Sequence, residues 1–285
     1  MSNKWTIKRL LDWTTEHFTK HQIENPHLEA EILLAHALNT ERIKLYVNFE
    51  QEVNEKDRGT FRDYVTRRTK KEPTAYITGY QPFMSLKFKV TRDVLIPRPE
   101  TELLLQEAVN IAKSYDKKLS VLDIGTGSGA IAVSLARFTD NIEVCATDLS
   151  KKALEIAAEN AKIHKVEGKV KFIETDIFPK ENIKFDIIIS NPPYIKSGDI
   201  KDLQTEVKDY EPVQALDGGK DGLDYYRKIL DKAGNYINKE GYLLLEIGSE
   251  QSKQIVDLIN NGLKPNNIEV KKDLSGIERM VIVRV

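Results

Sequence analysis

The first 72 residues alternate apolar and polar positions with the period of an α-helix. Apolar side chains recur every three or four positions in a run that follows Thr6, in a second run that begins near Pro26, and in a third over residues 55–68. This spacing places the apolar side chains of each run on one helix face, and a proline suits the first turn of a helix. The pattern predicts a small helical domain over residues 1–73.

Between residues 74 and 96 the period shortens to two, and aromatic or aliphatic positions alternate with polar ones around Gly79 and Pro82. Such alternation is typical of a β-hairpin, so we expect a hairpin connector over 74–96. Charge is uneven nearby, because residues 62–92 hold eight Lys or Arg against two acids. Two interpretations stay open, a solvated connector and a docking face for an RNA-rich partner.

From residue 97 onward, short apolar runs typical of buried strands alternate with helical patterns. The predicted strands are 119–124, 142–147, 170–174, 185–190, 241–247 and 279–284, with helices expected between the first four. This alternation predicts an α/β fold with a mostly parallel, doubly wound sheet and helices on both faces. We expect this third part to span residues 97–285.

Composition narrows the classes of function. The 285 residues carry 43 Lys or Arg and 44 Asp or Glu, a net charge of -1, which excludes a nucleic-acid binder with a wholly basic surface. No run approaches the roughly 20 apolar residues of a membrane span. The single cysteine, Cys145, excludes an intramolecular disulfide and thiolate metal sites, and the five histidines lack metal-binding spacing. We expect a cytoplasmic protein without a metal.

A glycine-rich loop follows the first predicted strand of the α/β part. Residues 120–124 lead directly into Gly125-Thr126-Gly127-Ser128-Gly129 and then into a helical pattern. Glycines let the backbone turn tightly and approach a ligand, and a helix N-terminus supplies unpaired N–H groups. Asp148 lies 19 residues beyond Gly129, at the end of the next strand, where a carboxylate can accept hydrogen bonds from an adenosine ribose. The loop therefore predicts a cofactor that contains adenosine.

Two such cofactors fit the loop. Gly125, Gly127 and Ala130 satisfy the dinucleotide pattern, so an NAD-dependent enzyme has to be considered. Asp123 stands just before the loop, and its carboxylate would repel a pyrophosphate but suits a ligand with an amino-acid moiety. The pattern favours S-adenosylmethionine.

The predicted strand 185–190 ends in Asn191-Pro192-Pro193-Tyr194. Consecutive prolines cannot continue a strand ladder, and open α/β sheets bind ligands at the carboxyl ends of their strands. A planar amide or amino nitrogen is a poor nucleophile because its lone pair is delocalised. The Asn191 side-chain oxygen and the Pro192 carbonyl can each accept one N–H of such a nitrogen, and Tyr194 can stack on the planar group. These residues predict methyl transfer to nitrogen, in which in-line positioning matters more than a strong base.

With these motifs the chain resembles the protein-(glutamine-N5) methyltransferases that modify class-1 peptide-chain release factors. The resemblance covers most of the chain and is strongest over residues 73–279. It rests on Glu72-Pro73-x-x-Tyr76-Ile77-x-Gly79, Leu95-Ile96-Pro97-Arg98-Pro99-Glu100-Thr101-Glu102, Asp123 to Gly129, Ser190-Asn191-Pro192-Pro193-Tyr194-Ile195, Tyr210-Glu211-Pro212, Ala215-Leu216-x-Gly218-Gly219-x-Asp221-Gly222-Leu223, Glu246-Ile247-Gly248 and Asp273-x-x-Gly276-x-x-Arg279. The Asn-Pro-Pro-Tyr motif is shared with DNA adenine methyltransferases, whereas residues 95–102 and 211–216 are more specific to this family.

The resemblance implies a Rossmann-like, class I S-adenosylmethionine-dependent methyltransferase domain that follows a helical substrate-recognition domain. It implies methyl transfer from S-adenosylmethionine to N5 of the glutamine in the Gly-Gly-Gln loop of class-1 release factors, with S-adenosylhomocysteine as product. The modified proteins act in translation termination. The implied catalytic residues are Asn191, Pro192 and Tyr194. The implied cofactor-binding residues are Asp123, Gly125, Thr126, Gly127, Ser128, Gly129, Asp148, Asp176, Ile177, Phe178 and Asn191. The implied substrate-binding residues are Asn191, Pro192, Pro193, Tyr194, Arg98, Glu100 and Thr101.

Three assignments stay open at this point. Family members often carry an aromatic residue directly after the acid at Asp176, but here Ile177 intervenes before Phe178, so either side chain could cover the adenine. Residues 96–102 are either part of the active site or simply a helix start, with Pro99 and acids in the first turn. Glu246 either lies near the site at a strand end or pairs with Arg279.

Two other functions are compatible with parts of the sequence. A DNA or RNA adenine-N6 methyltransferase would apply the same motif to a flipped base, but residues 93–285 hold 27 Lys or Arg against 32 Asp or Glu, and this acidic balance does not suit an anionic substrate. A silent S-adenosylmethionine-binding adaptor would have no use for the nitrogen-orienting Asn191. We expect no direct nucleic-acid substrate and no membrane association.

Overall fold

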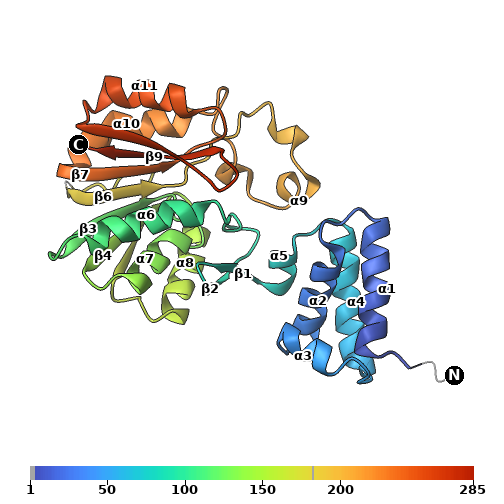
Figure 1. Ribbon diagram of the computed structural model, residues 1–285. Helices are drawn as coiled ribbons and strands as arrows, with labels where there is room; N and C mark the ends of the chain where they lie inside the picture. Colours follow the sequence, from blue (N-terminus) through green and yellow to red (C-terminus); the bar gives the residue numbers. More distant parts are fainter. Residues whose placement is uncertain (1–3, 182) are drawn as a thin grey trace. The chain divides into compact units, whose positions relative to one another are not determined.

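The computed structural model describes residues 4–181 and 183–285. The chain folds into two compact units (Figure 1). One unit runs up to Gly79 and includes Gln204–Tyr210, and the other comprises Tyr80–Leu203 and Glu211–Val285. This division differs from the one expected at two places: Gln204–Tyr210 packs with the helical unit, and the hairpin packs with the α/β unit.

The first unit is helical. Its helices are α1 (Ile7–Lys20), α2 (Pro26–Ala37), α3 (Arg42–Val47), α4 (Glu55–Thr69), α5 (Thr74–Thr78) and the short α9 (Thr205–Lys208). Thr6 caps α1 by accepting the Arg9 N–H at 3.3 Å, and Pro26 opens α2 as the sequence predicts. The helices enclose an apolar core around Phe18 and Leu33, both fully buried.

Ion pairs join α4 of this unit to its neighbours. Arg68 Nε donates to Glu29 at 2.9 Å and its Nη1 to Glu206 of α9 at 3.2 Å, while Arg67 forms a two-pronged pair with Glu72. Two of the eight cations in residues 62–92, Arg67 and Arg68, therefore form ion pairs within this unit.

The second unit begins with a two-stranded hairpin and continues as a sheet with helices on both faces. Its helices are α6 (Thr101–Lys113), α7 (Ala130–Phe138), α8 (Lys151–Ile163), α10 (Asp224–Tyr236) and α11 (Ser252–Gly262), with 3-10 turns at Ile200–Asp202 and Val213–Ala215. Its strands are β1 (Tyr80–Phe83), β2 (Leu86–Lys89), β3 (Leu119–Ile124), β4 (Ile142–Asp148), β5 (Val170–Glu174), β6 (Phe185–Ser190), β7 (Ile237–Glu246), β8 (Asn267–Lys272) and β9 (Glu278–Arg284).

Seven strands form one sheet in the order β5-β4-β3-β6-β7-β9-β8. The five strands from β5 to β7 are parallel, and β9 pairs antiparallel with both β7 and β8. Helices α6, α7 and α8 cover one face and α10 and α11 the other (Figure 1), each above its own apolar core. The mostly parallel, doubly wound sheet predicted from the sequence is confirmed, and β3 and β6 lie side by side at its centre.

A buried asparagine anchors the hairpin to this unit. Asn160 of α8 accepts the Lys89 N–H at 2.7 Å, and its side-chain NH2 donates to the Lys89 carbonyl at 2.9 Å and to the Ser128 carbonyl at 2.8 Å. Because one side chain satisfies backbone groups of both segments, it ties the hairpin to the glycine loop.

Three local expectations were wrong. Residues 74–78 are helical, because Pro73 starts a turn that Gly79 ends at φ +77°, so the hairpin begins only at Tyr80. The described residues between β5 and β6 contain no helix. Strand β8 was not predicted, because it lies at the sheet edge, where its side chains are half-exposed or exposed and no buried apolar run marks it. No helix of the described chain is both long and apolar enough to cross a membrane.

Candidate functional site

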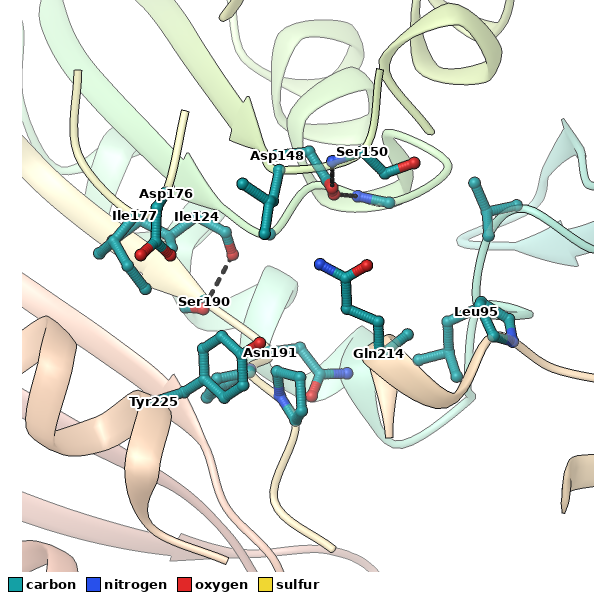
Figure 2. Close-up of a pocket in the computed structure, with 18 of the residues that line it drawn as sticks. Leu95, Ile124, Asp148, Ser150, Asp176, Ile177, Ser190, Asn191, Gln214 and Tyr225 are labelled. Atoms are coloured by element: carbon teal, nitrogen blue, oxygen red, sulfur yellow. Dashed lines mark hydrogen bonds between the residues drawn. The ribbon is translucent and has the colours of Figure 1, made fainter. Parts of the chain in front are cut away.

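A pocket of about 250 Å³ opens at the carboxyl ends of β3, β4 and β6 (Figure 2). Its floor is formed by Ile124, the last residue of β3, with Gly125 and Gly127 of the loop that follows, and one side by Asp148, the last residue of β4. Asn191 and the two prolines that follow it form the opposite side. The site therefore occupies the position at which open parallel sheets bind ligands.

The glycine loop turns on three residues in the left-handed region. Gly125, Gly127 and Gly129 have φ of +71°, +56° and +80°. A Cβ on Gly125 or Gly127 would meet nothing within 4 Å, so here the requirement is conformational and the space above the backbone is open to a ligand. A Cβ on Gly129 would lie 3.0 Å from the Cβ of Ala157, so this glycine also lets α7 pack closely on α8.

Asp123 supports the loop from below and does not line the pocket. The side chain is fully buried, and its Oδ2 accepts the Thr126 hydroxyl at 2.6 Å and the Ala132 N–H at 3.1 Å. Its Oδ1 has no hydrogen-bond partner, and burial raises the pKa of the carboxyl to about 7. Thr126 and Ser128 are buried as well, so of the predicted loop residues Gly125 and Gly127 are the ones that line the pocket.

Asp148 faces the pocket from the end of β4. Its Oδ2 accepts the Gly127 N–H at 2.9 Å and its Oδ1 accepts the Ser150 N–H at 2.8 Å (Figure 2). Burial raises the pKa of this carboxyl, and the N–H groups oppose the shift. The two carboxylate oxygens together offer about four acceptor positions, so Asp148 can still accept a hydroxyl from a ligand.

The structure shows which of Ile177 and Phe178 faces the pocket where the adenine is expected. Ile177 has a φ of +72°, in the left-handed region, and its carbonyl accepts the Thr147 hydroxyl at 2.8 Å. Ile177 and Asp176 line the pocket, whereas Phe178 is turned into the core, where its ring stacks on Tyr236 at 4.4 Å. Leu149, which the sequence analysis did not single out, is half exposed and adds an apolar side chain to the same wall.

The Asn-Pro-Pro-Tyr segment continues β6. The Ser190 hydroxyl, at the strand end, donates to the Ile124 carbonyl at 2.8 Å and so joins this segment to the glycine loop. Asn191, Pro192 and Pro193 line the pocket. Tyr194 does not line it: the side chain packs against the core on the α10–α11 face, and burial raises the pKa of its hydroxyl to about 12.

The two family-specific segments meet each other. The Arg98 guanidinium pairs with the buried carboxylate of Glu211, which also accepts the Ile96 N–H at 3.2 Å. Neither Arg98 nor Glu100 lines the pocket, but the pair joins the chain before α6 to the segment that carries Gln214. Gln214, a residue the sequence analysis missed, points its carboxamide into the pocket from this segment (Figure 2).

Behind Asn191 lies a buried polar pair. The Asn191 NH2 donates to the Thr101 hydroxyl oxygen at 3.1 Å, and the Thr101 hydroxyl donates to Glu246 Oε2 at 2.6 Å. Glu246 therefore lies near the site at the end of β7, while Arg279 pairs with Asp273 at 2.9 Å. Thr101 acts behind Asn191, since it is buried and does not line the pocket.

Pocket residues at the ends of buried strands could be predicted from the sequence, and those elsewhere could not. Asp148 ends a buried strand, and Asn191 and the prolines directly follow one. Leu149 and the stretch 92–95 lie outside the helices and strands, and Gln214 lies in a single 3-10 turn. Among the described side chains, no group of three or more His, Cys, Asp or Glu is arranged to hold a metal ion.

A doubly wound sheet with a glycine loop after β3, an acid at the end of β4 and Asn-Pro-Pro-Tyr after β6 is the arrangement of a methyltransferase. Family models agree: residues 9–79 match the PrmC N-terminal domain and residues 99–207 the methyltransferase small domain. The hMettl16 catalytic domain in complex with MAT2A 3′UTR hairpin 6 shares the fold, with a TM-score of 0.57 at 13% identity over 78% of this chain and 81% of that one.

Whole-chain relatives identify the family. The release factor glutamine methyltransferase of Geobacter sulfurreducens is 41% identical over 99% of this chain and 97% of the relative. That of Rhodopirellula baltica is also 41% identical, over 97% of this chain and 95% of the relative. The chain belongs to the release factor glutamine methyltransferase family.

Proposed function

We propose that the protein transfers a methyl group from S-adenosylmethionine to the side-chain nitrogen N5 of the glutamine in the Gly-Gly-Gln motif of class-1 release factors. The observation that carries the proposal is the pairing of the glycine loop with Asn191-Pro192-Pro193 across one pocket. Whole-chain similarity to proteins named release factor glutamine methyltransferase supports the choice of substrate.

The residues of the pocket suit this cofactor. Gly125 and Gly127 leave open space above their backbone for the methionine part, and Asp148 offers carboxylate oxygens to the ribose. The apolar side chains of Ile177 and Leu149 suit the faces of an adenine ring. Asp123 acts through the loop by holding Thr126, and Asp176 is the acid nearest the expected adenine amine. When bound, the cofactor supplies the methyl group, and its positively charged sulfur makes the remainder a good leaving group.

The chain's own task is to position the accepting nitrogen. The Asn191 side-chain oxygen and the Pro192 carbonyl oxygen each accept one N–H of the glutamine carboxamide, which fixes the direction of its nitrogen. Pro192 and Pro193 hold these two acceptors on a rigid backbone. A protonated amide is a strong acid, so the proton displaced by methylation passes to water without a dedicated base. Tyr194 supports the segment through its packing on the core.

The acidic balance of residues 93–285 does not favour a nucleic-acid substrate, and Asn191 in the pocket does not favour a silent adaptor. The helical unit remains our candidate for recognition of the release factor, whose action in translation places the proposed activity in the cytoplasm.

The test incubates a purified release factor with the protein and S-adenosylmethionine and analyses tryptic peptides by tandem mass spectrometry. We expect a mass increase of one methylene unit on the Gly-Gly-Gln peptide, located on the glutamine side chain. Asn191→Ala is the matched inactive control, and DNA and RNA are offered in parallel reactions. Absence of the modified peptide, or methyl incorporation only into nucleic acid, would overturn the proposal.

A further inference from the structure

Asn191 is held from behind by two buried side chains that belong to distant parts of the chain. Thr101 is the first residue of α6 and is 4% exposed, and Glu246 is the last residue of β7 and is 2% exposed. The contacts run in one line: Asn191 Nδ2 to Thr101 Oγ1 at 3.1 Å, and Thr101 Oγ1 to Glu246 Oε2 at 2.6 Å.

A carboxamide has a donor end and an acceptor end of nearly equal shape, so its orientation depends on its partners. An ionised Glu246 can only accept, and the single hydroxyl proton of Thr101 must then point to Glu246. The Thr101 oxygen is left as an acceptor, so it binds the NH2 end of Asn191. The oxygen end of Asn191 is thereby turned away from Thr101 and is available to an N–H donor.

We propose that Glu246 and Thr101 are positioning residues that fix the orientation of the Asn191 carboxamide, so that its oxygen is presented to the substrate nitrogen. We call the chain of hydrogen bonds from Glu246 through Thr101 to Asn191 the relay. This inference rests on the proposed function, because the relay has a task only if Asn191 accepts an N–H of the substrate. It extends the site to residues that touch neither substrate nor cofactor.

The protonation of Glu246 controls this orientation. A protonated carboxyl can donate to Thr101, whose hydroxyl can then donate to the Asn191 oxygen, so the carboxamide turns its NH2 toward the substrate. Burial raises the pKa of Glu246 to about 7, and the Thr101 hydrogen bond opposes that shift. The charged and titratable groups that act on Glu246 are Glu100, Arg98, Arg279, Tyr194 and Tyr226. This change of orientation is therefore expected near pH 7.

The first test removes the hydroxyl and keeps its shape. Thr101→Val is expected to lower kcat about 100-fold, since the acceptor is no longer fixed, while the Kd for S-adenosylhomocysteine changes less than about threefold. Thr101→Ser keeps the hydroxyl and is expected to stay within about threefold of wild type. The matched control is Thr139→Val, because Thr139 is equally buried but its hydroxyl has no hydrogen-bond partner. Wild-type kcat in Thr101→Val would overturn the relay.

The second test is the pH profile of kcat/KM, which reports ionisations of the free enzyme. In wild type and in Thr139→Val we expect kcat/KM to fall about tenfold per pH unit as pH drops below about 7, toward a low plateau. Glu246→Gln cannot ionise, and its carboxamide can either accept from or donate to Thr101, so we expect its kcat/KM to be independent of pH across this range. An unchanged acid limb in Glu246→Gln would overturn the relay even if Thr101→Val fails to fold.

The two proposals fail in different ways. If wild type itself does not methylate the release factor glutamine, the proposed function is wrong. If wild type, Thr101→Val and Glu246→Gln all methylate it with the same kcat and pH profile, the function stands and the relay is wrong.

Discussion

Two buried carboxyl groups of the α/β unit have similar surroundings but support different parts of the pocket. Asp123 and Glu246 each occupy the carboxyl end of a central strand or the position before it, each is buried, and each accepts a threonine hydroxyl at 2.6 Å. Burial raises the pKa of both to about 7. The threonines differ: Thr126 is three residues from its acid, whereas Thr101 is 145 residues from its acid.

This difference separates the two sides of the pocket. Asp123 stabilises a local turn, because its second partner is the N–H of Ala132 in the next helix. Glu246 acts through Thr101 on a side chain that lines the pocket, so its protonation reaches Asn191. The support of the glycine loop thus comes from one continuous stretch of sequence, residues 123–132, whereas the support of Asn191 comes from two distant stretches that carry Thr101 and Glu246.

The strongest way to separate the two sides is Asn191→Ala. The substitution removes an acceptor for the substrate nitrogen and leaves the glycine loop intact, so we expect turnover to fall about 1,000-fold. Titration calorimetry should show cofactor binding within about tenfold of wild type. Turnover equal to that of wild type would contradict the role given to Asn191.

On the opposite side, Asp148→Asn should act on binding. The variant loses one carboxylate acceptor and the charge that favours ribose hydroxyls, so we expect the cofactor Kd to rise about 10- to 100-fold. At saturating cofactor, kcat should remain within about threefold. A large fall in kcat with an unchanged Kd would show that the two sides are not separable in this way.

The glycine loop allows a comparison within the cofactor side. Gly129→Ala adds a Cβ at φ +80° and 3.0 Å from Ala157, so we expect it to lower the free energy of unfolding by about 2–3 kcal/mol. In Gly125→Ala the backbone is strained, but the added Cβ meets no atom within 4 Å. We therefore expect the free energy of unfolding to fall by about 1 kcal/mol. Urea unfolding of both variants provides the measurement, and equal losses would remove the packing role of Gly129.

The two buried carboxyl groups also predict a pH dependence of stability. The pKa of Asp123 rises from 3.8 to about 7 on folding, so its contribution to stability is present below pH 3.8 and is lost as pH rises to about 7. Asp123→Asn should therefore lose less stability than wild type between pH 4 and 7 in urea unfolding. Glu246 has the same sign, so identical slopes in wild type, Asp123→Asn and Glu246→Gln would contradict both assignments.

The same comparison shows which features of the fold and the site follow from the sequence. Strands β3, β4 and β6 are buried runs that lead straight into Gly125, Asp148 and Asn191, so both the strands and the polar residues after them could be predicted. Strand β8 lacks such a run, and helix α5 was hidden because its apolar residues also fit a period of two.

Side-chain direction and distant pairing could not be predicted. Ile177 has a positive φ, and the Phe178 ring after it stacks on Tyr236 in the core. An isoleucine at this position does not predict a positive φ, so the direction of Phe178 could not be predicted. The contact of Arg98 with Glu211 and of Thr101 with Glu246 depends on the three-dimensional arrangement of strands and loops far apart in sequence. The relay behind Asn191 therefore became visible only in the structure.

The central claim is that the pocket presents the oxygen of Asn191 and the carbonyl of Pro192 to the nitrogen of a substrate glutamine. A crystal structure with S-adenosylhomocysteine and a Gly-Gly-Gln peptide tests it most directly, because the Pro192 carbonyl can only accept and so marks the nitrogen end of the carboxamide. We predict that this end lies within hydrogen-bond distance of both Pro192 O and the Asn191 side chain, with Asn191 still bonded to Thr101. A glutamine bound elsewhere, or an Asn191 carboxamide detached from Thr101, would contradict the claim.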